Sequence, residues 1–385
     1  MKNLAILGST GSVGQSTLEV VRENRERFNI ELLLANSNVD LMIKQCEEFQ
    51  PNYVYLADDH AKKSFLSKAG SLDSKITLLS EEDEILSILE SKIIDVVVAA
   101  MVGVAGLVPV YHAVKNGKNV LLANKESYVV AGELLNDLSV QNSSTIFPID
   151  SEHSAIHQCL QGVEDKTSIS RLILTGSGGP FLHRDSKDFS SITPKEAITH
   201  PVWNMGDKIS VDSSTMMNKC LEIIEARWLF DNENIEVLIH PEGLVHSLVE
   251  FKDNSIIAQL SVPDMKIPIA HGLGFPDKIN SGSKKIDFEE ISKLTFMKPD
   301  EGKFPSLSLA RDCLQVGGSS FTILNAVNEV CVDAFLKGKI AYLDIYRIIS
   351  KILDKSEITE VKGLESIFEA DSQSRKEALE LIKLN

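Results

Sequence analysis

The amino-acid sequence predicts an α/β protein built in three parts. Over residues 1–149, short β-branched or leucine-rich runs alternate with helical patterns, which is typical of a parallel sheet with crossover helices. Residues 150–276 lose this rhythm and contain strand-like stretches of their own, whereas residues 305–385 are helical in pattern. We therefore expect an N-terminal parallel-sheet domain, a central α+β domain, a surface linker over 277–304 and a C-terminal α-helical bundle.

Length and composition indicate a soluble globular protein with more than one core. The chain has 385 residues, of which 43% are hydrophobic and 24% charged. The net charge of −16 disfavours nucleic acid or an anionic membrane as a partner. A small phosphorylated substrate remains compatible with this charge, because it needs only a few local cations.

The start of the chain and its cysteines favour a cytoplasmic location. The N-terminus enters a strand pattern at once and lacks the basic start, apolar run and cleavage site of a signal peptide. The longest uncharged run, 96–114, contains Gly103, Gly106 and Pro109, so it is interpreted as a strand, a loop and a helix start. The five cysteines form no CxxC pair, which predicts reduced thiols.

The first domain is expected to contain six strands. These cover residues 4–7, 30–34, 53–56, 94–98, 119–122 and 145–149. Apolar residues at helical spacing predict a helix from Val39 that stops before Pro51. Ser80 and Asp83 resemble a capping pair at the start of a second helix, and Pro109 is expected to begin a third.

Unusual polar residues follow four of these strands. Residues 8–14 follow the first strand, 36–38 the second, 124–126 the fifth and 150–153 the sixth. Open α/β sheets bind ligands at the carboxyl ends of their strands. One crevice is therefore expected to collect all four segments.

Residues 8–14, Gly-Ser-Thr-Gly-Ser-Val-Gly, lie between a predicted strand and a predicted helix. Glycines let the backbone approach a pyrophosphate, and the helix N-terminus offers free N–H groups. The spacing differs from GxGxxG, and a plain tight turn is the alternative, but the strand-turn-helix setting favours a Rossmann-like dinucleotide site. Asn36, Ser37 and Asn38 offer no carboxylate to repel a 2′-phosphate, so NADPH is favoured over NADH.

Asp150 and Glu152 stand where the sixth strand ends. Alternate residues of an extended chain point to one side, so these carboxylates can converge. At ~4 Å and an effective dielectric of about 20 they repel by roughly 4 kcal/mol, which a bound cation would remove. The alternative is a helix cap and a solvated charge. Glu222 offers a third oxygen, and an all-carboxylate set suits Mg²⁺ or Mn²⁺.

The central domain contains two segments that suit a phosphate. Strands are expected at 171–175, 236–240, 246–251 and 255–261, and the first runs into a glycine-rich loop around Ser177. If a helix begins near Ser213, Asn218 and Glu222 share a face with Lys219 beside them. A loop that needs positive φ angles and a solvated helix face are the respective alternatives.

Residues 200–208 combine Pro and Gly with Trp203, an arrangement expected of a flexible lid over a ligand. A structural loop anchored by Trp203 is the alternative, and His153 and His200 taken singly are better explained as structural histidines. In the C-terminal region, an apolar stripe over 321–335 ends before Gly338, and helices are expected at 342–354 and 372–383. This bundle is interpreted as a packing or dimer-supporting element.

Several of these segments together resemble one family. GSTGSVGQSTLEVV, LLANKES, PIDSEHSAI, LTGSGGPF, HPVWNMGDKISVDSSTMMNK and LEIIEARWLF, spread over residues 8–230, are similar to motifs of the 1-deoxy-D-xylulose 5-phosphate reductoisomerases. The resemblance implies conversion of that sugar phosphate to 2-C-methyl-D-erythritol 4-phosphate with NADPH and Mg²⁺ or Mn²⁺, Co²⁺ being a further option. It also implies the non-mevalonate isoprenoid route and a cytoplasmic homodimer.

The resemblance assigns roles residue by residue. The metal would lie on Asp150, Glu152 and Glu222, and the catalytic candidates are Lys125, Glu152 and His153. The substrate would contact Lys125, Ser151, Glu152, Ser177, His200, Trp203, Ser213, Asn218, Lys219 and Glu222. NADPH would contact Thr10, Gly11, Ser12, Val13, Asn36, Asn38, Asn124, Glu126, Met205 and Gly206.

Some positions depart from the family pattern, and two other functions are alternatives to it. Cys220 stands where the family commonly has Gly, Ser37 replaces a frequent Lys or Arg, and His157 is atypical, as are residues 242–243. A semialdehyde dehydrogenase would need a nucleophilic cysteine in an electropositive setting, which Cys159 lacks. A non-catalytic NADPH sensor would need no metal site.

Overall fold

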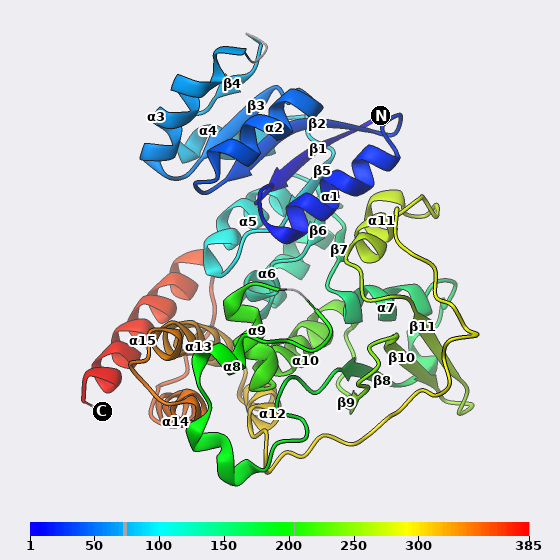
Figure 1. Ribbon diagram of the computed structural model, residues 1–385, viewed down its shortest axis with the longest axis vertical. Coiled ribbons are helices and arrows are strands. Elements are labelled where there is room, and N and C mark those ends of the chain that lie inside the picture. The colour runs from blue at the N-terminus through cyan, green and yellow to red at the C-terminus, as the bar shows by residue number, and fades with distance from the viewer. Residues whose placement is uncertain (72–74, 204, 385) are drawn as a thin grey trace. The chain divides into compact units, whose positions relative to one another are not determined.

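The computed structural model describes residues 1–71, 75–203 and 205–384 (Figure 1). Its contacts divide the chain into two compact units, each with its own sheet and hydrophobic core. Unit 1 consists of Met1–Ser127, Glu133–Ser154 and Asp264–Lys284. Unit 2 consists of Tyr128–Gly132, Ala155–Pro263 and Lys285–Asn385. Asn204, within the predicted lid, lies outside the described residues.

Unit 1 contains a seven-stranded sheet in the order β4-β3-β2-β1-β5-β6-β7 (Figure 1). Every ladder between neighbouring strands is parallel, so all carboxyl ends lie on one edge. The strand order reverses at β1, where such sheets form their ligand crevice. The strands are β1 Lys2–Leu7, β2 Phe28–Ala35, β3 Tyr53–Leu56, β4 Thr77–Leu78, β5 Val96–Ala99, β6 Asn119–Leu122 and β7 Ile146–Pro148.

Helices connect these strands. They are α1 Ser12–Glu23, α2 Val39–Phe49, α3 Asp59–Lys68, α4 Glu82–Glu90, α5 Leu107–Lys115 and α11 Lys266–Gly274, with 3₁₀ turns at Ala69–Ser71 and Val104–Gly106; α6 Lys125–Asn142 and α7 Ser151–Cys159 also begin in this unit. Leu4, Ile6 and Val98 of the central strands are fully buried, as expected for a parallel sheet covered on both faces.

The predicted parallel sheet is confirmed, with three corrections. The sequence analysis missed β4, because two residues are too few to show a pattern. The helix expected from Ser80 and Asp83 is α4, but its capping box is formed by Glu81 and Glu84. The helix expected from Pro109 begins two residues earlier at Leu107, because a 3₁₀ turn leads into it.

Unit 2 contains a four-stranded sheet in the order β11-β10-β8-β9. Its strands, β8 Ile169–Gly176, β9 Ile235–Ile239, β10 Val245–Phe251 and β11 Ile256–Leu260, all overlap the predicted stretches. β10 is antiparallel to β8 and β11, whereas β8 and β9 are parallel. The remaining elements are α8 Pro194–Ala197, α9 Asp207–Ser214, α10 Met217–Phe230, α12 Ser306–Val316, α13 Ser320–Leu336, α14 Tyr342–Leu353, α15 Leu364–Leu384 and 3₁₀ turns at Lys166–Ser168 and Ser186–Ser191.

The C-terminal region is helical, as predicted. The apolar stripe over 321–335 lies on α13, whose Leu324, Val327 and Phe335 are buried. α15 begins eight residues before the expected 372. Leu364, Ile367 and Phe368 in its first two turns recur at helical spacing, a pattern that the sequence analysis did not use. Within the described parts of the chain, no helix has the length and hydrophobicity needed to cross a membrane.

The single helix expected from Ser213 is wrong, because the chain forms two helices there. α9 ends at Ser214, and α10 starts at Met217 after Met216 adopts a left-handed conformation with φ of 62°. Thr215 Oγ1 donates to the carbonyls of Val211 and Asp212 at the end of α9. Ser213 therefore lies at the C-terminal end of one helix, and Asn218 lies in the first turn of the next.

Candidate active site

The glycine-rich segment 8–14 joins β1 to α1 in unit 1. A Cβ atom at Gly14 would lie 2.3 Å from the carbonyl oxygen of Gly8, so glycine is required for this tight connection. The N-cap residue Gly11 provides no side-chain cap, which leaves N–H groups of the first turn available to an anion. Thr10, Gly11, Ser12 and Val13 form this turn.

The loops after β2 and β6 lie on the same edge of the sheet. Asn36, Ser37 and Asn38 are exposed, and Asn38 Oδ1 accepts from the Leu41 N–H at 3.2 Å, capping α2. Asn124 is buried, donates from Nδ2 to the carbonyls of Met101 and Gly103, and caps α6. The side chain of Asn124 therefore fixes the loop that follows β5. Glu126, one residue into α6, is also buried.

A cluster of charged groups lies where β7 ends and α6 begins. The ammonium of Lys125, which is 5% exposed, forms an ion pair with Asp150. Ser151 Oγ donates to Glu152 Oε2 at 2.5 Å, and Nδ1 of the fully buried His153 lies 3.9 Å from Asp150 Oδ2. Unit 1 thus brings together all the predicted site residues of this region.

The extended-strand geometry that was expected to bring Asp150 and Glu152 together was wrong. β7 ends at Pro148, and Glu152 lies in the first turn of α7, so Asp150 and Glu152 do not alternate along an extended strand. Asp150 directly precedes α7, in the position of the proposed cap, but its ion pair with Lys125 is an interaction that a simple cap would not need.

Ser177 and His200 meet in unit 2 at the glycine-rich loop after β8. Nδ1 of His200 accepts from the N–H groups of Val202 and Trp203 at 3.1 and 2.9 Å, so its proton resides on Nε2 in the neutral ring. Nε2 lies 3.1 Å from Ser177 Oγ, which also accepts from the Gly179 N–H at 3.2 Å. With both lone pairs engaged, the Ser177 hydroxyl proton is directed elsewhere and can be donated to a ligand.

The first two turns of α10 carry Asn218, Lys219 and Glu222. Glu222 is fully buried, accepts a hydrogen bond from Asn218 and lies 2.6 Å from Lys219 Nζ. Lys219 Nζ also donates to the Thr175 carbonyl at 2.6 Å, which connects α10 to the end of β8, two residues before Ser177. The predicted shared face of Asn218 and Glu222 is therefore confirmed.

Trp203, in the predicted lid, contacts a histidine that the sequence analysis missed. The Trp203 ring lies 6.3 Å from the ring of His246 in β10, centroid to centroid. Met205 and the exposed Gly206 lead into α9, with Gly206 as its N-cap. A histidine in the strand-like sequence VHSLVEF was the available signal for His246.

All five cysteines are free and buried. Burial raises the pKa of the Cys159 thiol to about 11 and that of Cys46 to about 12, so neither is a thiolate at neutral pH. A semialdehyde dehydrogenase requires a reactive cysteine thiolate. The thiols of this chain therefore argue against that alternative.

Native protein treated with iodoacetamide at pH 8 is expected to be alkylated much more slowly than the denatured chain, with activity retained. The reason is that each thiol is both buried and protonated. Mass spectrometry with a parallel activity assay provides the measurement. Rapid labelling of one cysteine with matching loss of activity would restore the thiol-enzyme alternative.

Comparison with known proteins covers the chain from end to end. Residues 4–132 match the family described as 1-deoxy-D-xylulose 5-phosphate reductoisomerase. Residues 146–230 and 260–377 match two C-terminal domains of the same enzyme. The proteins of that name from Tolumonas auensis and Shewanella halifaxensis are 42% and 45% identical, covering 97% and 100% of both chains compared.

Solved structures agree with these sequence matches. A DOX-P reductoisomerase in complex with NADPH, fosmidomycin and magnesium has a TM-score of 0.94 at 42% identity, covering 100% of this chain and 99% of its own. The 1-deoxy-D-xylulose 5-phosphate reductoisomerase of Zymomonas mobilis, in complex with NADPH, has a TM-score of 0.92 at 36% identity, covering 99% of both. The chain therefore belongs to the 1-deoxy-D-xylulose 5-phosphate reductoisomerase family.

Proposed function

We propose that this chain isomerises and reduces 1-deoxy-D-xylulose 5-phosphate to 2-C-methyl-D-erythritol 4-phosphate in the non-mevalonate isoprenoid pathway, with NADPH and a divalent metal. The observation that carries the proposal is the family match over the full length. The proposed parts are a cofactor domain over 1–149, a catalytic domain over 150–276, a linker over 277–304 and a helical domain over 305–385.

Asp150, Glu152 and Glu222 are the proposed metal ligands. The set offers only oxygen, which suits Mg²⁺ or Mn²⁺, with Co²⁺ as a further option. Glu222 is buried and held by Asn218 and Lys219, so its carboxylate is already oriented. When bound, the cation supplies Lewis acidity to the ketone and the adjacent hydroxyl of the substrate.

The proposed phosphate site uses residues of unit 2 only. Ser177, His200, Ser213, Asn218 and Lys219 offer two hydroxyls, an imidazole, an amide and an ammonium, which are suitable donors to phosphate oxygens. The first turn of α10 adds its N–H groups. Trp203 in the lid, beside His246, is proposed to exclude water from the bound substrate.

Lys125, Glu152 and His153 are the proposed catalytic groups, with Ser151 contacting the substrate. Lys125 Nζ beside Asp150 can donate a hydrogen bond or proton to the reacting oxygens. Ser151 orients Glu152 through its hydroxyl. His153 is fully buried near Asp150, so it is proposed to orient that carboxylate.

NADPH is proposed to bind residues 10–13, Asn36, Asn38, Asn124 and Glu126, with Met205 and Gly206 from the lid segment. When bound, it supplies the hydride for the reduction. The open first turn of α1 suits the pyrophosphate, and the exposed 36–38 loop without a carboxylate suits a 2′-phosphate. Asn124 would contribute mainly by shaping the loop, since its side chain is engaged with backbone groups.

The test is an NADPH-oxidation assay with 1-deoxy-D-xylulose 5-phosphate. Turnover is expected with Mg²⁺ or Mn²⁺, to vanish after thorough chelation and to return when either metal is restored. NADH is expected to support slower turnover than NADPH. The reason is that the 36–38 loop offers hydrogen-bond donors to the 2′-phosphate of NADPH and contains no carboxylate that would repel it. Full turnover after chelation would overturn the metal proposal, and equal use of both nucleotides would overturn the selectivity.

The active protein is further proposed to be a cytoplasmic homodimer. β11 is an edge strand of the unit 2 sheet, and its Ile256 and Ile257 are 50% and 46% exposed. An exposed apolar edge strand pairs readily with a second chain. Free, buried thiols suit a reducing compartment.

Ile257→Lys is expected to shift the protein from dimer to monomer, because a charge on the paired edge disfavours association. Val140→Lys serves as the matched control, since Val140 in α6 is 82% exposed and lies in unit 1. Light scattering coupled to size exclusion measures the mass. A wild-type monomer, or a dimer that survives Ile257→Lys, would contradict the proposed interface.

A further inference from the structure

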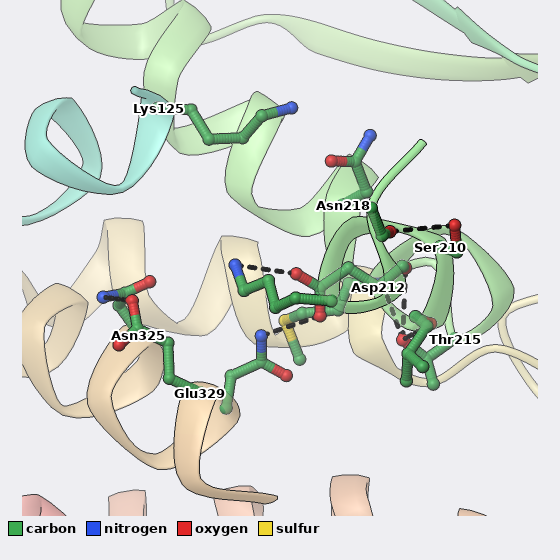
Figure 2. A network of polar contacts seen from close by, with 12 residues as sticks. Lys125, Ser210, Asp212, Thr215, Asn218, Asn325 and Glu329 are labelled. Atoms are coloured by element: carbon green, nitrogen blue, oxygen red, sulfur yellow. Dashed lines mark hydrogen bonds and ion pairs between the residues drawn. The ribbon is translucent and has the colours of Figure 1, made fainter. Parts of the chain in front are cut away.

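Buried polar groups hold the end of α9 that carries Ser213 (Figure 2). Asp212 precedes Ser213, and its side chain is 1% exposed. Asn328 Nδ2 on α13 donates to Asp212 Oδ1 at 2.9 Å, and Lys208 Nζ lies 2.9 Å from Asp212 Oδ2. One carboxylate oxygen is thus engaged by the C-terminal bundle and the other by the first turn of α9.

A second contact from the bundle holds the residue after Ser213. The Tyr342 hydroxyl on α14 donates to the carbonyl of Ser214 at 2.6 Å. Burial raises the pKa of Tyr342, so its phenol stays a protonated donor at any working pH. Ser213 therefore lies between two residues that are each fixed by a different C-terminal helix.

The loop of Ser177 packs directly on this fixed segment. Gly179 has φ of +67°, and a Cβ atom there would lie 2.8 Å from the carbonyl oxygen of Ser213. The two hydroxyl-bearing segments of the proposed phosphate site thus touch through backbone atoms. A displacement of α9 would change the spacing between Ser177 and Ser213 at once.

Packing alone does not account for this arrangement. Asn328 is fully buried on α13, as are Thr322 and Asn325, and burying an amide and a carboxylate costs free energy that apolar side chains would not. What the polar pair adds is a defined direction and distance between α13 and α9.

We propose that Asp212 is a positioning residue for the substrate phosphate. Held by Asn328 and Lys208, it fixes the C-terminal end of α9 so that the Ser213 hydroxyl is presented to the phosphate. Asp212 itself touches no substrate. The inference rests on the proposed contact between Ser213 and the phosphate, and it gives the C-terminal bundle a role in substrate affinity.

The test is Asp212→Asn, which keeps the size and the Oδ1 acceptor but places an amide against the Lys208 ammonium. Loss of this charged interaction is expected to raise the KM for 1-deoxy-D-xylulose 5-phosphate by about tenfold or more. The KM for NADPH and kcat at saturating sugar phosphate are expected to stay near wild type. Asn328→Ala, which removes the donor from α13, is also expected to raise the KM for the sugar phosphate. This variant tests the positioning role if Asp212→Asn folds poorly.

Glu329→Gln is the matched control. Glu329 is the neighbour of Asn328 on α13, and it accepts from Asn325 and Arg375 without contacting α9. This variant is expected to lower the unfolding temperature while leaving the KM for sugar phosphate unchanged. If Asp212→Asn and Asn328→Ala likewise lower only the unfolding temperature, the positioning role is overturned.

Ser213→Ala distinguishes failure of the positioning role of Asp212 from failure of the proposed contact between Ser213 and the phosphate. If Ser213→Ala raises the KM and the Asp212 and Asn328 variants do not, the phosphate contact stands and the inference alone fails. If Ser213→Ala leaves the KM unchanged, the phosphate contact is wrong and the inference falls with it.

Discussion

Replacing Glu222 with Gln is expected to reduce turnover by more than about 100-fold. Removing a residue that only hydrogen-bonds to a metal ligand already lowers metal affinity or activity by about 10- to 100-fold, and Glu222 is proposed to be a ligand itself. The amide removes a negative charge from the proposed ligand set and leaves the side-chain volume unchanged. Its oxygen can still accept from Lys219 or Asn218, so the fold of unit 2 is preserved. NADPH affinity, measured by fluorescence titration, is expected to stay at the wild-type value, and activity should respond weakly to added Mg²⁺.

Asp231→Asn is the control on the same helix. Asp231 is the C-cap of α10, its side chain is 84% exposed, and Asn tolerates its left-handed conformation. It forms an ion pair with Arg227 at the surface, so wild-type turnover is expected. Wild-type turnover in Glu222→Gln would instead remove Glu222 from the active site.

Lys125→Met is expected to lower kcat by about 10²- to 10⁴-fold, the usual contribution of a positioned proton donor. Met keeps most of the buried apolar stem and removes the ammonium next to Asp150. Steady-state kinetics and NADPH titration together separate a chemical defect from a binding defect. Partial recovery of kcat with added ethylammonium would identify the missing group as the ammonium itself.

Lys118→Met is the matched control for a buried lysine in the same unit. Lys118 is 7% exposed and donates to the carbonyls of Ser91 and Ile94, and burial lowers its pKa. Its replacement is expected to lower the unfolding temperature without changing kcat. If both variants lose stability and neither loses kcat, Lys125 is a structural residue.

The fold could be predicted where hydrophobic patterns are long and regular. The strands β1, β2 and β5 contain the apolar runs LAIL, LLLA and VVVA, and the stripe on α13 repeats at helical spacing over four turns. Short elements could not be predicted. β4, for example, pairs only two residues with β3, and two residues are too few to form a hydrophobic pattern. The sequence analysis also did not anticipate that Asp264–Lys284 packs with the N-terminal sheet, since tertiary contacts leave no local signal.

Parts of the candidate site could be predicted from residue types and their spacing in the sequence. The glycine spacing at 8–14 and the four-residue spacing of Asn218 and Glu222 depend only on local geometry, and both arrangements are present. Local reasoning failed at Glu152, where a helix begins earlier than the strand pattern implied, and at Met216, whose left-handed conformation no propensity predicts. Asp212 and Asn328 lie 116 residues apart, so only the fold reveals their pairing.

The start of α10 as a separate helix at Met217 has a consequence for the proposed site. Asn218 and Lys219 stand in the first turn of α10 and Glu222 one turn later, and the side chains of the proposed phosphate donors directly contact the proposed metal ligand. α10 is buried along most of this stretch and cannot stretch or slide independently. A displacement of α10 would therefore move the proposed phosphate donors and the proposed metal ligand together, so the two proposed substrate contacts are coupled.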